Sequence, residues 1–112
     1  MKRSDFEKLA DEGYEQLPQW VREKIKNVAL LIKDEPSDEV RKREGLESDE
    51  TLLGYYQGVP LSERGDQYGV GAVVPDTITL YLLPIEQAAE EDEMDVRDVN
   101  ADTIWHEYAH HL

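Results

Sequence analysis

Two histidines and a glutamate near the end of the sequence have the types and the spacing of a metal-dependent hydrolytic site. The segment His106-Glu107-Tyr108-Ala109-His110 matches the pattern H-E-x-x-H. On a helix, residues four apart project from the same face about one turn apart. Both imidazoles can then reach one zinc ion, while Glu107 beside the first histidine can take a proton from a water that the metal activates.

The position of this segment in the sequence strengthens the interpretation. All three histidines of the chain lie within its last seven residues, on a predicted helix. The alternative is a surface helix end at which histidines complement the helix dipole. His111 lies about 100° around the helix from His110, so we expect it to miss the metal and either to support a ligand or to pack.

Apolar spacing predicts helices at both ends of the chain. At the N-terminus, Ser4 and Glu7 form a predicted capping box, and the helix should stop between Gly13 and Leu17, ahead of Pro18. A second helix is expected to start at Pro18. The predicted helices near the C-terminus cover residues 85–90 and run from Val96 to the end, with Ile104 and Trp105 packing the last helix onto a sheet.

Three apolar runs predict strands at residues 28–32, 51–57 and 77–83. The first run is continuously apolar and predicts a buried strand, whereas residues 34–48 predict an exposed turn or short helix. The third is expected to expose an edge that can pair with an extended peptide. The element order predicts an α+β fold: a small twisted sheet of three to four strands with an N-terminal helix and a C-terminal helix.

The charge balance limits the partners. Twelve Lys and Arg stand against 26 Asp and Glu, so the formal net charge is −14. Such a surface repels nucleic acids and anionic membranes, and we expect neither as a partner. Between Glu86 and Glu107 there are nine acids and one base, which indicates a solvated face or, alternatively, a field that attracts cations or basic peptides.

The remaining composition bears on the class of protein. The absence of cysteine excludes disulfides, cysteine-ligated zinc and thiol catalysis. The first residues lack the apolar stretch of a signal peptide, and no window has the length of a membrane span. At 112 residues we expect a single domain, cytoplasmic, and a monomer or weak dimer.

Several stretches together resemble the small bacterial zincin-like metallopeptidase family, whose signature is H-E-x-x-H-x-x-G-x-x-D. The resemblance covers almost the whole chain and is most specific in the doubled histidine His110-His111 and in residues 58–64, Gly-Val-Pro-Leu-Ser-Glu-Arg. It implies a minimal zincin-like fold, one Zn²⁺ ion held by His106 and His110, Glu107 as the catalytic base, and a peptide or protein substrate.

The family pattern continues beyond the printed sequence. Its glycine and its aspartate ligand would fall at positions 113 and 116, so the third metal ligand is unknown, and we expect a domain truncated at the C-terminus. The alternative function is a non-catalytic peptide- or protein-binding domain with a vestigial metal site. Glu63 and Arg64 either line the cleft or belong to a solvated loop. Four tyrosines are expected in the core or on the sheet rather than as transition-state donors: Tyr55, Tyr56, Tyr68 and Tyr81.

Overall fold

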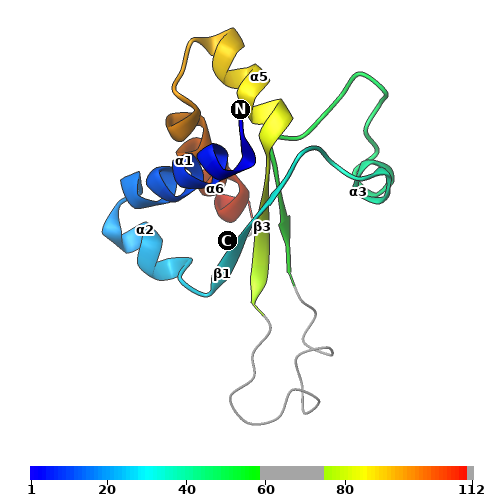
Figure 1. Ribbon diagram of the computed structural model, residues 1–112. Helices are drawn as coiled ribbons and strands as arrows, with labels where there is room; N and C mark the ends of the chain where they lie inside the picture. Colours follow the sequence, from blue (N-terminus) through cyan, green and yellow to red (C-terminus); the bar gives the residue numbers. More distant parts are fainter. Residues whose placement is uncertain (59–74, 111–112) are drawn as a thin grey trace, which may run out of the picture.

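A three-stranded mixed sheet lies at the centre of the fold in the computed structural model, which describes residues 1–58 and 75–110 (Figure 1). Strand β3 (Asp76–Tyr81) is the middle strand. Strand β1 (Val28–Lys33) runs parallel to it on one side, and β2 (Gly54–Gln57) runs antiparallel on the other. The predicted three- to four-stranded α+β architecture is confirmed.

The strand order corrects the predicted edge. Because β3 pairs on both sides, the prediction that residues 77–82 offer an exposed edge is wrong. Four successive residues of β3, Ile78 to Tyr81, are buried, which shows that both of its faces are covered. Among the described strands, the free edges of the sheet belong to β1 and β2 instead.

Strand β1 is the apolar run that predicted a buried strand, and this prediction is also wrong. None of its residues is fully buried, and Leu31 remains 42% exposed. The strand pairs only with β3, so its other edge receives no strand partner in the described part of the chain. The guanidinium of Arg3 donates a hydrogen bond to the carbonyl of Ile32, which occupies one acceptor of this strand. Such a contact hinders further strand pairing at an edge.

Helix α1 (Arg3–Gln16) begins one residue before the predicted cap. Lys2 occupies the N-cap position, and no side chain caps the helix, so the predicted capping box of Ser4 and Glu7 is not formed. Ser4 instead lies inside the first turn. The predicted end is confirmed, because α1 stops at Gln16, two residues before Pro18.

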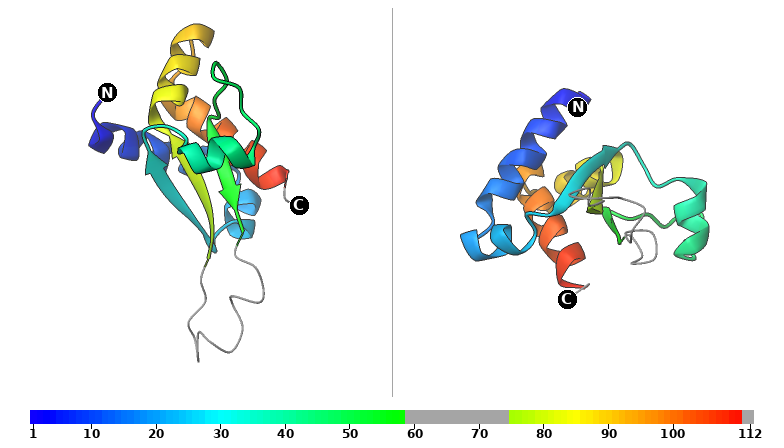
Figure 2. Two further views of the ribbon diagram at one scale, coloured as in Figure 1. Left: turned by 90° about the vertical axis from the view of Figure 1, so that its right-hand side faces the viewer. Right: turned by 90° about the horizontal axis from the view of Figure 1, so that it is seen from below.

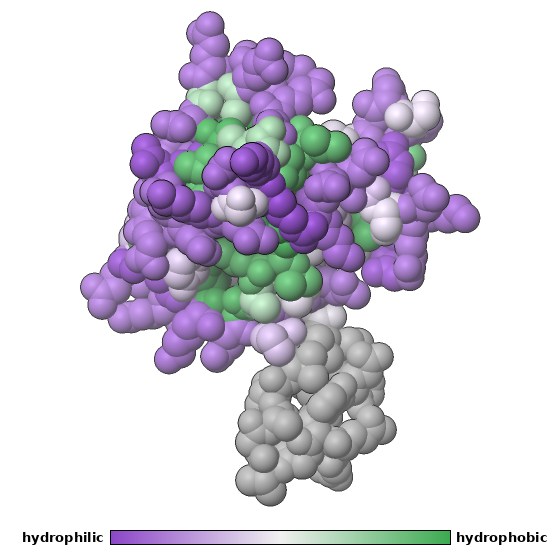
Figure 3. Space-filling model, in the orientation of Figure 1, coloured by the Kyte–Doolittle hydropathy of each residue, from purple (hydrophilic) through white to green (hydrophobic). Residues whose placement is uncertain are grey.

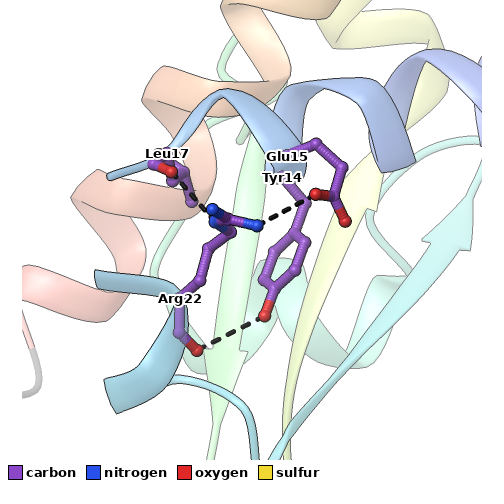
Figure 4. A network of polar contacts seen from close by, with 4 residues as sticks. All are labelled: Tyr14, Glu15, Leu17 and Arg22. Atoms are coloured by element: carbon purple, nitrogen blue, oxygen red, sulfur yellow. Dashed lines mark hydrogen bonds and ion pairs between the residues drawn. The ribbon is translucent and has the colours of Figure 1, made fainter. Parts of the chain in front are cut away.

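A short polar network fixes α2 (Gln19–Lys24) against the end of α1 (Figure 4). Arg22 donates from Nε to the Leu17 carbonyl at 3.1 Å and from Nη1 to the Glu15 carboxylate at 3.0 Å. The hydroxyl of Tyr14 donates to the Arg22 carbonyl at 3.4 Å. The turn at Pro18 is therefore held from both of the helices that it joins.

Helices α3 and α5 each follow a strand, and α6 follows α5. Helix α3 (Asp38–Arg43) is short and is capped by Ser37, whose hydroxyl accepts from the Val40 amide at 3.2 Å. Helix α5 (Leu82–Asp92) starts directly after β3, earlier than predicted, and Pro84 fits into its first turn because the amides there need no helical acceptor. Helix α6 (Val96–Ala109) matches the predicted last helix.

The helices α1 and α6 cover one face of the sheet, and α3 lies on the opposite side (Figure 2). Gly13 lets α1 approach α6 closely, since a Cβ there would lie 2.7 Å from the Arg97 carbonyl oxygen. Ile104 is fully buried as predicted, whereas the Trp105 ring meets Trp20 of α2 edge-on at 5.7 Å. The buried core between these elements includes Phe6, Ala10, Val21, Ile25, Ile78, Leu80, Ile85 and Val99.

The surface is mostly hydrophilic in the orientation of Figure 1, with hydrophobic patches near β1 and near α5 (Figure 3). No helix in residues 1–58 and 75–110 is both long enough and apolar enough to cross a membrane.

Candidate active site

Helix α6 presents the two motif histidines one turn apart. Regular helical hydrogen bonding continues to His110, whose amide donates to the His106 carbonyl at 3.1 Å. Both histidines are exposed and Glu107 is half-buried. The helical geometry that the spacing predicts is therefore present over the whole segment.

The ring of His106 is oriented by the backbone of its own helix. Its Nδ1 lies 2.8 Å from the carbonyl oxygen of Asp102. A carbonyl oxygen only accepts, so Nδ1–H is the donor, and in the neutral ring the lone pair lies on Nε2. Histidine ligands of metals usually donate their second ring nitrogen in this way, and the arrangement fits His106 for metal binding through Nε2.

The carboxylate of Glu107 is bound to the backbone of strand β2. Its Oε1 accepts a hydrogen bond from the Tyr56 amide at 3.2 Å. Glu107 thus links the motif helix to a strand 51 residues earlier in the sequence. This contact places the predicted general base beside the sheet.

The pairing of β2 shows on which side of the strand Glu107 lies. The Tyr81 amide donates to the Leu53 carbonyl at 3.0 Å, so this pair is hydrogen-bonded across the antiparallel ladder. Hydrogen-bonded and non-bonded pairs alternate along such a ladder. The backbone groups of Gly54 and Tyr56 consequently point away from β3, toward the free edge of β2. Glu107 lies at that free edge.

Gly54 permits the close approach of α6 to β2. A Cβ at this position would lie 2.7 Å from Cγ2 of Thr103 and 3.4 Å from Cγ of Glu107. The hydroxyl of Thr103 donates to the Val99 carbonyl at 2.7 Å, which holds this buried side chain in place. Any larger residue at position 54 would push the helix that carries the motif away from the strand.

Two adjacent cavities open beside Glu107, and both include Leu52, Gly54 and Glu107. The first, here called the His106 pocket, has a volume of about 400 Å³. The second, the His110 pocket, has a volume of about 460 Å³. The His106 pocket is lined by residues 51–54, by Ala88, Asp92 and Met94, and by Val99, Asp102, Thr103, His106 and Glu107 of α6. The His110 pocket is lined by Glu44, Leu52, Gly54, Tyr55, Tyr56, Glu107 and His110.

The three tyrosines of the sheet differ in burial and in their hydrogen-bond partners. Tyr81 is buried in the core as predicted, and burial raises the pKa of its phenol, with further contributions from the charges of Tyr55 and Glu107.

Tyr55 lines the His110 pocket, and its hydroxyl accepts from Arg43 Nη1 at 3.5 Å, which raises the pKa of Arg43. The hydroxyl of Tyr56 donates to the Asp76 carboxylate. No pattern in the sequence connected Tyr55 or Tyr56 with the motif.

Some predicted site residues lie outside the described part of the chain. These are Glu63, Arg64 and His111. Tyr68, which was expected in the core or on the sheet, also lies outside the described residues. Within residues 1–58 and 75–110, no three His, Asp or Glu side chains come together as a metal site. The described residues therefore contribute two histidines and a glutamate of the motif to the candidate site.

Comparison with known proteins gives the fold and the family. A solved structure of a conserved hypothetical protein from Thermus thermophilus is similar, with a TM-score of 0.59 and 20% identity over 98% of this chain and 92% of the other. The two chains therefore share a fold. No curated protein sequence matches significantly. The family model for zincin-like metallopeptidases matches residues 25–112, which include β1, β2, β3 and the complete motif helix. The chain therefore belongs to the zincin-like metallopeptidase family.

Proposed function

We propose that this protein is a zinc-dependent peptidase in which His106 and His110 hold one Zn²⁺ ion and Glu107 is the general base. The observation that carries the proposal is the position of Glu107, next to both histidines and at the free edge of β2, where its carboxylate accepts from the Tyr56 amide. The donor set fits zinc, because two imidazoles one turn apart supply neutral nitrogen ligands and the Nδ1–H of His106 is already bonded. When bound, zinc supplies Lewis-acid polarisation of a carbonyl and a lower pKa for water.

The free edge of β2 is the proposed binding site for the substrate backbone. The main-chain groups of Gly54 face this edge, so an extended peptide can add to the sheet as a further strand. The peptide would then run past Glu107 and between the two pockets. This moves the peptide site from β3, the edge expected from the sequence, to β2.

In the proposed reaction, Glu107 accepts a proton from the attacking water as the water oxygen bonds to the carbonyl carbon. Glu107 then delivers that proton to the amide nitrogen as the carbon–nitrogen bond breaks. The products are a free carboxyl group and a free amine.

A cytoplasmic location and a monomeric or weakly dimeric state remain predictions for this protein.

The test is peptide hydrolysis by the full-length, zinc-supplemented protein, followed by mass spectrometry of a mixed peptide library. We expect Glu107→Gln to lower the cleavage rate by about 10²–10⁴-fold, the usual contribution of a general base. Glu90→Gln, on the exposed side of α5, is the matched control and should cleave at the wild-type rate. Equal cleavage by the Glu107→Gln variant would refute the mechanism.

A second candidate function is a non-catalytic peptide-binding domain with a vestigial metal site. It is favoured by the observation that the main-chain groups of Gly54 face the free edge of β2, where an extended peptide can add to the sheet with or without a metal. The same library separates the two candidates. Peptides that bind but are never cleaved by the zinc-supplemented protein would support the binding domain.

A further inference from the structure

We propose that the His106 pocket binds a lysine or arginine side chain of the substrate, and this inference rests on the proposed peptidase function. The pocket is continuous with the candidate active site, because His106, Glu107 and Gly54 all form part of its wall. A peptide that lies along β2 with its reacting carbonyl at Glu107 has a neighbouring side chain beside this opening.

The inner wall of the pocket is apolar. Leu52, Leu53, Ala88 and Val99 line it, and Val99 is buried while the other three are half-buried. Its volume of about 400 Å³ lies within the usual range for small-ligand sites. Such a wall suits the methylene stem of a long side chain, which gains by leaving water.

Apart from the ion that His106 would hold, the charged groups on the pocket wall are all acidic, and they are Asp92, Asp102 and Glu107. Asp92 is the last residue of α5, and Asp102 lies on α6 one turn before His106; both are exposed, and no Lys or Arg among the described residues lines this pocket. The C-terminal end of the α5 dipole adds partial negative charge near Asp92. Arg97 of α6 is directed to Asp95 at 3.5 Å and is not among the residues that line this pocket. A cationic group at the end of an apolar stem therefore complements both parts of the wall.

The alternatives make different demands on the same pocket. An acidic side chain would meet the carboxylates Asp92 and Asp102 and be repelled. A neutral apolar side chain would bury the same stem but gain no electrostatic attraction. Since each exposed ion pair contributes little, we expect lysine to be preferred over a neutral side chain of equal length by about fivefold at low salt.

The experiment compares acetylated peptides of one sequence that carry lysine, norleucine or glutamate at a single central position. Binding to the zinc-supplemented Glu107→Gln variant is measured by fluorescence anisotropy. Two series of peptides are compared, and the varied residue lies before the reacting carbonyl in one series and after it in the other. We expect the lysine peptide to bind about fivefold more tightly than the norleucine peptide, with the preference shrinking as salt is added. The glutamate peptide should bind most weakly.

Substitutions then test whether Asp92 and Asp102 cause the preference for lysine over norleucine. Asp92→Asn and Asp102→Asn should each reduce it, and the double variant should abolish it. Asp98→Asn, on the same helix but outside the pocket, is the matched control and should keep it. Circular dichroism shows whether each variant folds. If a variant does not fold, the salt dependence of the lysine preference in the protein with both aspartates still tests the proposal. Equal or tighter binding of norleucine, or a preference that survives the double variant, would overturn the proposal.

The failure of this inference and the failure of the proposed function are distinguishable. A protein that cleaves peptides without any lysine or arginine preference beside the cut keeps the function and refutes the pocket assignment. A protein that cleaves nothing, yet binds lysine peptides through Asp92 and Asp102, refutes the peptidase and keeps the pocket.

Discussion

The substitution Gly54→Ala tests whether the motif helix is held against β2 as described. The added Cβ would lie 2.7 Å from Thr103 Cγ2 and 3.1 Å from the Thr79 carbonyl oxygen, both closer than ordinary van der Waals contact. Overpacking a core of this kind costs about 1–3 kcal/mol. Replacing a glycine within a strand returns about 0.5–1 kcal/mol through chain entropy. The net expectation is a loss of about 0–2.5 kcal/mol in the free energy of unfolding, centred near about 1 kcal/mol, which corresponds to roughly 4 °C in Tm for a domain of this size.

A second substitution identifies the clash as the cause. Thr103→Ser removes Cγ2 but keeps the hydroxyl that donates to the Val99 carbonyl. In Gly54→Ala/Thr103→Ser the most severe contact is gone, so the double variant should be more stable than the sum of the single effects by about 1 kcal/mol. The assay is urea denaturation of all four proteins followed by circular dichroism. Strictly additive losses would show that Gly54 and Thr103 do not meet, and the described approach of α6 to β2 would be wrong.

Two further perturbations test other contacts. Gly13→Ala would place a Cβ 2.7 Å from the Arg97 carbonyl oxygen and 3.0 Å from the Ala101 amide nitrogen, both backbone atoms that no rotamer change can move. Although alanine has the better helix propensity, we expect denaturant unfolding to show a loss of about 1–3 kcal/mol in the free energy of unfolding. Wild-type stability of this variant would contradict the α1–α6 packing. The pKa of Tyr81 is raised in the folded state, chiefly by burial, so its phenol loses a proton more readily in the unfolded chain. The free energy of unfolding should therefore fall as the pH rises above about 10 and through the raised pKa of the folded state. Tyr81→Phe should lose less stability at alkaline pH, and a pH profile identical to that of the wild type would refute this effect of Tyr81.

The motif helix could be predicted from the sequence because its information is local. The spacing of His106 and His110, the acidic residues before Val96 and the apolar Ile104 all lie within one short segment. The structure extends this helix as expected and adds the Asp102 carbonyl that orients His106. That contact is also local, four residues earlier, and could have been anticipated from helical geometry.

The strand order could not be predicted in the same way. The apolar run of β1 reads as a buried strand, but burial depends on which strands pair on either side, and pairing is set by contacts between distant segments. The Glu107–Tyr56 contact joins residues 51 apart, and no periodicity in either segment indicates it. The pockets depend on the same distant pairing, so Leu52, Tyr55 and Asp92 carried no signal that connected them with the motif.

The most direct test of the central claim is zinc binding by the full-length protein, measured by isothermal titration. We predict one Zn²⁺ ion per chain in the wild type and at least a roughly tenfold loss of affinity in His106→Ala and in His110→Ala, with Glu107→Gln retaining the stoichiometry. His111→Ala is the natural comparison, since this neighbouring histidine is expected to miss the metal. A wild type that binds no zinc, or histidine variants that bind it as tightly as the wild type, would contradict the account.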